Sequence, residues 1–196
     1  MKSTAQNFRQ THFVGLLPPD ELSQTIENCR AWTNEKFGCK SGHATPVHIT
    51  IVPPFALSHE FSTTDVVDCA KVAVEKLIAE ENFPFVAKVC GFGAFEERTI
   101  FAKVEQSEKW NRLREKITAE MQKSFPKIKR ATKEYQPHLT VANRDIPNGE
   151  IGNALEYFAE LNLDFSFCAD NVAIFTRSKN GIWEICDKNV LYASAD

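Results

Sequence analysis

Apolar and polar positions along the chain form two kinds of run. Runs that alternate, or that hold mostly β-branched and aromatic residues between turn-forming residues, predict strands. They cover residues 11–17, 47–52, 83–90, 99–104, 135–142, 171–177 and 182–187. Runs with apolar residues three or four positions apart predict helices that bury one face. They begin at Asp20, at Thr63 or Thr64, at Ser107 and at about Glu150, and end near Phe37, Ile78, Pro126 and Leu161.

Turn-forming residues set the expected ends of these runs. Pro53 and Pro54 should end the second strand, since proline lacks the amide hydrogen that a sheet needs. The segment 91–94 predicts a turn or a bulge, and Ser178 to Gly181 predicts the turn of a hairpin. The order is strand, helix, strand, helix, two strands, helix, strand, helix and further strands, which is an α+β pattern.

The chain has two halves of similar content and no linker rich in glycine, serine or proline between them. With 196 residues it has the size of a single domain. We therefore expect one unit, residues 1–196, made of two lobes that pack together.

The composition is that of an ordinary globular protein, with 43% hydrophobic and 25% charged residues. The formal net charge is −3, whereas proteins that bind long nucleic acids usually present a strongly basic face. No extended nucleic-acid surface is expected, so that an RNA substrate would be short or a chain end.

Six cysteines are scattered without a C-x-x-C pair or zinc-finger spacing, which indicates reduced thiols and no metal site. No apolar run approaches the roughly 20 residues of a membrane span, and the N-terminus lacks a secretion signal. Phosphate-binding glycine loops for ATP or NAD are absent too, so that no cofactor is expected. We expect a cytoplasmic protein without membrane contact, and a monomer.

Two short strands carry the same triplet, His-x-Thr, within an apolar frame. Side chains alternate along a strand, so that His48 and Thr50 share one face while Val47, Ile49 and Ile51 share the other. The apolar face can enter a core while the polar face meets solvent in a groove.

The second copy is His138 and Thr140, with Leu139 and Val141 on the other face. Imidazole titrates near neutral pH, so that one ring can accept a proton while the other donates one. Threonine hydroxyls can donate hydrogen bonds to phosphoryl oxygens. Cleavage of a phosphodiester needs both proton transfers and requires no metal. The pattern therefore favours acid and base catalysis on a phosphodiester.

The triplet alone is weak evidence, because short motifs recur by chance. A third copy, His43 to Thr45, lies in a polar stretch, precedes Pro46 and lacks the apolar frame. We interpret it as coincidence. His12 and His59 have no partner in the sequence, and we expect surface or packing roles for both.

With its frame, the pair of motifs resembles the 2H phosphoesterases, and within them the LigT-like branch of 2′-5′ RNA ligases and cyclic phosphodiesterases. The resemblance rests on residues 47–51 and 137–141, and the hairpin from Phe175 to Trp183 and the strand before Pro18 extend it over nearly the whole chain. It implies a bilobal, pseudo-symmetric fold of two antiparallel sheets that line a central cleft, with helices outside. Gln136 departs from the basic or aromatic residue of many relatives, which leaves the substrate open.

The resemblance also implies metal-free hydrolysis or transfer at 2′,3′-cyclic phosphates or 2′-5′ linkages. By analogy, His138 would activate the water or hydroxyl and His48 would protonate the leaving oxygen, although the residues themselves allow the reverse. Thr50 and Thr140 would hold the non-bridging oxygens.

Aromatic and basic residues near the motifs are candidates for substrate contact. Aromatic rings stack on unpaired bases, and Tyr135, Phe55, Trp183 and Phe175 are the candidates, although most aromatic residues belong to cores. Guanidinium and ammonium groups bind phosphate, and the candidates are Arg130, Lys133, Arg144, Arg177 and Lys179. We select Arg177 among them. Two alternatives stay open: RNA ligation as the main activity, and a non-catalytic module that binds a nucleotide or RNA end.

Overall fold

The computed structural model of the protein describes residues 11–96, 98–128, 134–186 and 191–192. The helices are α1 (Asp20–Phe37), the short 3-10 helix η1 (Ser41–Ala44), α2 (Thr63–Ala79), α3 (Glu108–Ser124) and α4 (Ile151–Ala159). The strands are β1 (His12–Leu16), β2 (Ile49–Phe55), β3 (Phe85–Phe95), β4 (Thr99–Val104), β5 (His138–Asn143), β6 (Asp164–Ala169), β7 (Asn171–Arg177), β8 (Trp183–Ile185) and β9 (Leu191–Tyr192).

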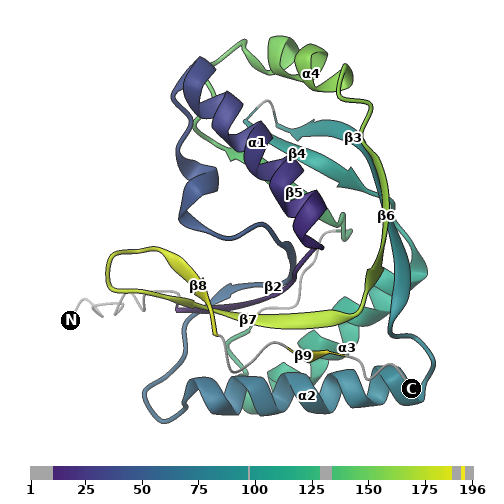
Figure 1. Ribbon diagram of the computed structural model, residues 1–196. Coiled ribbons are helices and arrows are strands. Elements are labelled where there is room, and N and C mark those ends of the chain that lie inside the picture. Colours follow the sequence, from purple (N-terminus) through teal and green to yellow (C-terminus); the bar gives the residue numbers. More distant parts are fainter. Residues whose placement is uncertain (1–10, 97, 129–133, 187–190, 193–196) are drawn as a thin grey trace.

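The strands pair in the order β6-β3-β4-β5-β2-β1-β7-β8, and β9 pairs with β7. Every pairing is antiparallel. One lobe holds β6, β3, β4 and β5, and the other holds β2, β1, β7 and β8 (Figure 1). The lobes join where Ile49 of β2 pairs with Leu139 of β5. The predicted α+β fold with two pseudo-symmetric lobes is confirmed, and one short pairing links its two sheets into a single open path.

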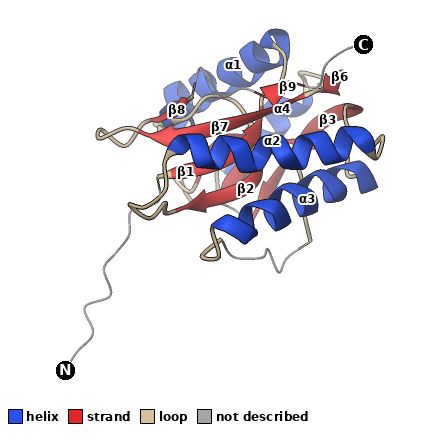
Figure 2. Cartoon of the chain, turned by 90° about the horizontal axis from the view of Figure 1, so that it is seen from below, coloured by secondary structure: helices blue, strands red, loops and turns tan. Residues whose placement is uncertain are grey.

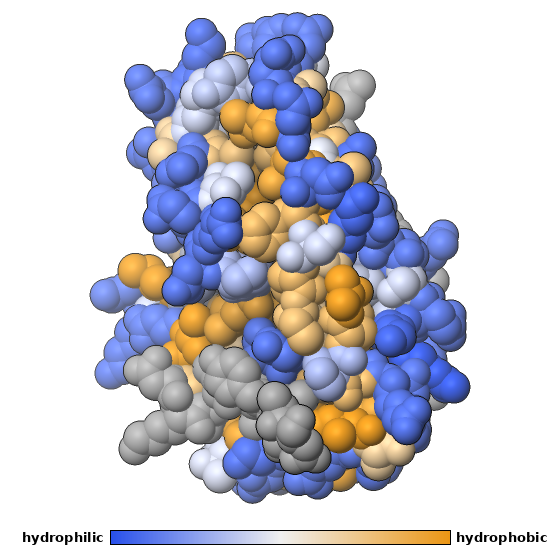
Figure 3. Space-filling model, turned by 45° about the vertical axis from the view of Figure 1, so that its right-hand side comes forward, coloured by the Kyte–Doolittle hydropathy of each residue, from blue (hydrophilic) through white to orange (hydrophobic). Residues whose placement is uncertain are grey.

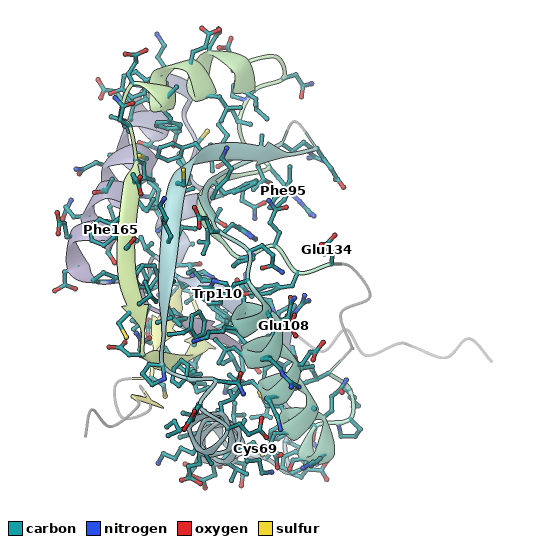
Figure 4. The ribbon with its side chains drawn as sticks, turned by 90° about the vertical axis from the view of Figure 1, so that its right-hand side faces the viewer. Cys69, Phe95, Glu108, Trp110, Glu134 and Phe165 are labelled. Atoms are coloured by element: carbon teal, nitrogen blue, oxygen red, sulfur yellow. The ribbon has the colours of Figure 1, made fainter. Side chains whose placement is uncertain are left out.

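The helices lie outside the strands, two to each lobe. The helices α2 and α3 run side by side along the lobe of β2 and β7 (Figure 2). The other lobe is covered by α1, which packs on β5, and by α4, which packs on β3. Because α1 follows β1 in the chain yet covers the opposite lobe, the two lobes are interleaved. Trp110, 1% exposed at the start of α3, packs on Phe85 with ring centroids 5.0 Å apart (Figure 4).

The chain also crosses between lobes from β6 to β7, with Asp170 alone between the two strands. Asn171 secures this crossing through its side-chain amide. Its Oδ1 accepts a hydrogen bond from the backbone N–H of Leu17 at 2.9 Å, and its Nδ2 donates one to the Leu17 carbonyl at 2.9 Å. The end of β1 is therefore tied to the start of β7.

In the first motif strand, a β-bulge follows the threonine. Thr50 pairs with Gly15, but the next pair along β1 is Val14 with Val52, so that Ile51 has no partner. A bulge of this kind bends a strand and shifts the alternation of its side chains by one residue.

The second motif strand carries the same bulge at the equivalent position. Thr140 pairs with Phe101, and the next pair is Ile100 with Ala142, which leaves Val141 without a partner. The alternation therefore shifts, and Asn143 lies on the same face as the motif side chains.

Four strands differ most from the sequence-based expectations, and one of them, β9, lies beyond the last strand expected. β2 does not end before Pro53 but continues to Phe55, because both prolines fall in an irregular stretch of the β1–β2 pairing where ladder hydrogen bonds are not needed. β3 continues through the predicted bulge, where the register shifts between Val89 and Phe92, and ends at Phe95. β6 was missed, although Phe165 and Phe167 alternate with polar residues along it.

An apolar surface covers part of the β3–β6 pair. Val86 is 78% exposed there, and the thiols of Cys90 and Cys168 are exposed. Figure 3 shows a band of apolar residues between hydrophilic flanks on this side. All six cysteines, each of which the structure describes, are free of disulfide bonds. Over the described ranges, no helix is long and apolar enough to cross a membrane.

Candidate active site

A cleft of about 600 Å³ lies where the two lobes meet, and all four predicted motif side chains line it. Its lining residues are Phe13, Arg30, Ser41, Gly42, Thr45, His48, Thr50, Pro54, Phe95, Glu96, Arg98, Thr99, His138, Thr140, Asn143, Arg144 and Trp183. β2 and β5 contribute from the two sides of their shared pairing. The structure therefore brings together the two motifs, which are about 90 residues apart in the sequence.

His48 lies just before β2 and is fixed by its neighbours. Its Nδ1 is 2.8 Å from the carbonyl oxygen of Pro46 and donates to it, because a carbonyl can only accept. The other ring nitrogen, Nε2, faces the cleft and lies 3.1 Å from Thr50 Oγ1. The imidazole packs against Phe13 and Phe175, with ring centroids 4.7 and 5.1 Å away. One tautomer and one orientation of the ring are thereby selected.

His138, the first residue of β5, is fixed in the same way. Its Nδ1 donates to the carbonyl oxygen of Gln136 at 2.8 Å. Its ring packs against Phe95 and Phe101, with centroids 5.1 and 5.3 Å away. Figure 4 shows Phe95 near the end of β3, on the side of the strands away from α1. In both motifs, a carbonyl two residues before the histidine and two phenylalanines direct Nε2 into the cleft.

The two imidazoles differ in their electrostatic surroundings. Burial, together with the positive charges of Arg30 and His138, lowers the pKa of His48 to about 4, and the hydrogen bond to Pro46 opposes this shift. Burial also lowers the pKa of His138 below its ordinary value, and the hydrogen bond to Gln136 opposes that shift. His48 is therefore neutral above about pH 4, and Arg30 is one reason for it.

Arg30 of α1 is a buried cation at the floor of the cleft, with 2% of its side chain exposed. Its Nε and one terminal nitrogen donate to the carbonyl of Thr140 at 3.1 and 3.0 Å. The other terminal nitrogen donates to the carbonyl of Thr45 at 2.9 Å and to Glu27 at 2.8 Å. One guanidinium thus holds the second motif strand and the loop that leads into the first motif.

That loop is pressed closely onto β5. A Cβ at Gly42 would lie 2.7 Å from the carbonyl oxygen of Val141 and 3.0 Å from Arg30, so that no larger residue fits without movement. Asp145 accepts hydrogen bonds from the backbone N–H groups of Lys40 and Ser41 at 2.6 and 2.8 Å. The loop that forms this wall of the cleft is therefore held firmly against β5.

Aromatic residues form the end of the cleft on the first-motif lobe. Phe13 stacks on Phe175 with centroids 4.2 Å apart, and Trp183 meets Phe13 edge-on at 4.8 Å. The guanidinium of Arg177 lies 5.5 Å from the centre of the Trp183 ring. Arg177 is itself exposed and does not line the cleft; besides its contact with Trp183, its Nε donates to the carbonyl of Gly181 at 3.2 Å.

Polar and basic residues form the other end, on the second-motif lobe. Thr99 Oγ1 donates to Asn143 Oδ1 at 3.1 Å. Arg98 and Arg144 lie beside them, each exposed, at the adjoining ends of β4 and β5. The backbone N–H of Arg144 donates to the carbonyl of Arg98 at 2.7 Å.

Two predicted substrate contacts lie outside the cleft lining. Phe55 is 7% exposed in the main core, stacked at 6.3 Å on Phe125, because the bulge and the prolines before it turn its ring to the α2–α3 side. Tyr135 donates through its hydroxyl to the carbonyl of Thr50 at 2.8 Å, and Arg114 lies 4.6 Å above its ring. Tyr135 therefore supports the first motif strand from the segment that leads into the second.

The remaining predictions have mixed outcomes. His43 is exposed on η1 and does not line the cleft, whereas Thr45 of the same triplet does. His12 is packed at 7% exposed, with Nε2 3.0 Å from Thr63 Oγ1. Arg130 and Lys133 lie outside the described residues. Among the described residues, no three His, Cys, Asp or Glu side chains gather as metal ligands would.

The sequence reasoning missed Arg30, Phe13 and Asn143 as cleft residues. Arg30 lies on a predicted amphipathic helix at a position whose neighbours are apolar, and a charged residue on a buried helix face is a usable signal. The side chain of Asn143 faces the cleft because the bulge at Val141 shifts the alternation, and no local sequence pattern predicts that bulge.

Comparisons with known proteins agree with this geometry. Residues 18–181 match the family model of the 2′-5′ RNA ligase superfamily. The solved structure of TT0787 from Thermus thermophilus superimposes with a TM-score of 0.64 at 17% identity, covering 93% of this chain and 97% of the other.

LigT of E. coli complexed with 3′-AMP superimposes with a TM-score of 0.60 at 14% identity, covering 90% of this chain and 93% of the other. Its complex with NADP+ has a TM-score of 0.54 at 14% identity and the same coverage. No curated protein matches the sequence. At these identities the structures establish a shared LigT-like fold, and the family match spans most of the chain: the protein belongs to the 2′-5′ RNA ligase superfamily, the 2H phosphoesterases.

Proposed function

We propose that this protein is a phosphodiesterase that acts on 2′,3′-cyclic phosphates or 2′-5′ linkages at nucleotides and RNA ends, without a metal. The observation that carries the proposal is the duplicated geometry of the motifs. Each histidine is held by a carbonyl two residues before it, each packs against a stacked pair of phenylalanine rings, and each threonine precedes a bulge in one shared cleft. Membership of a phosphoesterase superfamily supports the enzymatic role.

The two imidazoles would divide the proton transfers between them. In hydrolysis of a cyclic phosphate, a base takes a proton from water as its oxygen bonds to phosphorus. An acid gives a proton to the ribose oxygen as the other P–O bond breaks, so that a phosphate monoester forms. The hydroxyls of Thr50 and Thr140 would donate to the non-bridging oxygens.

The electrostatics favour His48 as the base and His138 as the acid, the reverse of the assignment by analogy. The base must be neutral, and His48, with a pKa of about 4, is neutral near neutral pH. Arg30 beside it would also disfavour a second positive charge there. No cation is among the causes that shift the pKa of His138, which keeps protonation easier at that ring.

A nucleotide ligand has further support from relatives. LigT of E. coli has been crystallised with 3′-AMP and with NADP+. In this chain, the partly exposed Trp183 provides aromatic surface for a base next to the motifs, and the buried Phe13 supports its ring from behind. Arg177, over the Trp183 ring, would hold that surface in place.

The decisive experiment is a product screen. Purified protein would be incubated with 2′,3′-cyclic nucleotides, with 2′-5′ and 3′-5′ dinucleotides and with RNA ending in a cyclic phosphate, each with and without EDTA. We expect turnover of a cyclic phosphate or a 2′-5′ linkage that EDTA does not reduce, and no turnover by the His48→Ala/His138→Ala double variant.

Other outcomes would contradict the proposal in distinct ways. Tight binding without product would indicate a nucleotide-binding module. Joining of RNA ends faster than their hydrolysis would indicate a ligase. Loss of activity in EDTA with recovery in zinc would indicate a metallohydrolase.

A further inference from the structure

We propose that the polar end of the cleft binds the phosphate of a neighbouring nucleotide, so that the preferred substrate is an RNA end of at least two nucleotides. The site consists of Arg98, Arg144 and Asn143, on the lobe of the second motif. This inference rests on the proposed function, because it assumes that the reacting phosphate lies between the two histidines.

The cleft carries a local excess of positive charge. Its charged lining residues are Arg30, Arg98 and Arg144 against Glu96, whereas the whole chain has a net charge of −3. A concave surface of one sign attracts a ligand of the opposite sign. The excess is therefore suited to a polyanion.

The three arginines are engaged very differently. Arg30 is buried and makes its hydrogen bonds to two backbone carbonyls and to Glu27. Arg98 and Arg144 are exposed, and neither has an ion pair with another described residue. Guanidinium groups bind phosphate through two parallel hydrogen bonds. Arg98 and Arg144, the outer pair, therefore have guanidinium groups available to bind the phosphate of a ligand.

The position of the outer pair suits a second phosphate. Asn143 ends β5 three residues after Thr140, which corresponds to roughly 10 Å of strand, and Arg144 is the next residue. The centre of the cleft already has Thr50, Thr140 and Arg30 for the reacting phosphate. The outer arginines are therefore placed for a phosphate at an adjoining linkage.

The backbone holds this end of the cleft in a defined shape. Arg144 has φ of 69°, a left-handed conformation that residues other than glycine seldom adopt. The N–H of Arg144 is bonded to the Arg98 carbonyl, and the next residue, Asp145, is tied to Lys40 and Ser41. Unusual backbone of this kind persists where the surroundings enforce it, often at ligand sites. Here it sets the two arginines next to each other.

Asn143 completes the site. Its Oδ1 accepts from Thr99, which leaves the two hydrogens of Nδ2 for another acceptor, and no bond of Nδ2 to a described residue competes with it. With aromatic rings at the other end of the cleft, the site gives the substrate a direction: one base stacks on Trp183 and the adjoining phosphate lies at Arg98 and Arg144.

The test compares two substrates that share the same reacting group. One is adenosine 2′,3′-cyclic phosphate, and the other is a dinucleotide that ends in the same cyclic phosphate. We expect the dinucleotide to have at least a tenfold higher kcat/KM, since a charged hydrogen bond contributes about that factor. The Arg98→Ala/Arg144→Ala variant should reduce this ratio to about 1, and added salt should reduce the ratio in the wild type.

Arg112→Ala is the matched control, because Arg112 is an exposed arginine on α3, away from the cleft. It should leave the ratio unchanged. A wild-type ratio near 1, or a ratio that the double variant retains, would overturn the inference. The melting temperatures of the variants show whether they fold.

A separate arm distinguishes this inference from the proposed function. If the wild type turns over neither of these substrates and no 2′-5′ linkage in the product screen, the proposed function fails. Binding of the same two compounds to the His48→Ala/His138→Ala variant, measured by calorimetry, still tests the site. Tighter binding of the dinucleotide that depends on Arg98 and Arg144 supports it, and equal binding contradicts it.

Discussion

The two lobes present the same motif in the same backbone geometry but surround it with different side chains. On the first-motif side, Trp183 lines the cleft beside the phenylalanine pair that packs on the histidine. On the second-motif side, Thr99, Asn143 and Arg144 line it beside the corresponding phenylalanine pair. The shared features direct two imidazoles into one cleft, and the differing features distinguish its two ends. The shared geometry supports the proposed acid and base catalysis, and the differing residues would give the proposed substrate a direction.

The lobes also differ in charge at the histidines. Arg30 comes from α1, which covers the second-motif lobe, yet its charge is among the causes that lower the pKa of His48. Arg30 lines the cleft from the second-motif lobe, and no described residue of α2 or α3, the helices of the first-motif lobe, is among the lining residues. Two chemically equal histidines are thereby made unequal, as acid and base catalysis requires.

Removing either histidine should have the largest effect and should separate their roles. His48→Asn or His138→Asn should lower kcat/KM by about 10²- to 10⁴-fold, the usual size of an acid or base contribution. In the wild type, kcat/KM should fall below about pH 4 as His48 gains a proton, and should fall on the alkaline side at a pKa below 6.5 as His138 loses one. His48→Asn should abolish the acidic limb and His138→Asn the alkaline limb.

His59→Asn, which changes an exposed histidine, is the control and should leave the profile unchanged. If the limbs are lost in the opposite order, the two roles are the reverse of those proposed. A loss of less than tenfold in both variants would contradict acid and base catalysis by this pair.

Removing the buried cation should have the next largest effect. Arg30→Met should lower kcat/KM by about 10- to 100-fold, because the carbonyls of Thr140 and Thr45 lose their donors. It should also raise the pKa of His48, since a positive charge nearby disfavours protonation. The acidic limb of kcat/KM should then move to higher pH, which a purely structural role of Arg30 would not produce.

Arg30→Lys is the matched variant, because it keeps the charge and loses the branched hydrogen bonding. It should keep the acidic limb near its wild-type position while still lowering kcat/KM. An acidic limb that stays in place in Arg30→Met would show that the charge does not act on His48.

The aromatic end should give the smallest effect. Trp183→Ala should raise KM for a cyclic nucleotide about fivefold with little change in kcat, since stacking on one base contributes about 1 kcal/mol or more. Trp183→Phe should retain most of the affinity. A change in kcat with an unaltered KM would indicate that Trp183 acts through His48 rather than on the base.

Local sequence patterns predicted most of the secondary structure and the two motifs, and particular residues show where such patterns fail to predict a position. Alternation around His48 and His138 predicted their face, and helical periodicity predicted α1 to α4. Closeness to the first motif in the sequence made Phe55 a candidate for substrate contact, but the bulge at Ile51 and the irregular proline stretch turn it into the core. Bulges depend on the partner strand, which local patterns do not contain.

The sequence by itself determined the four motif side chains, the four helices and most of the strands, and the lack of an overall basic charge, because these depend on residue identity and short-range periodicity. The tertiary structure decided which residues complete the cleft. Arg30 arrives from a helix that crosses to the opposite lobe, and Asn143 arrives through a bulge that the β4 pairing imposes. Hydrogen bonds and burial between segments far apart in the chain set these positions, and no short window of sequence specifies them.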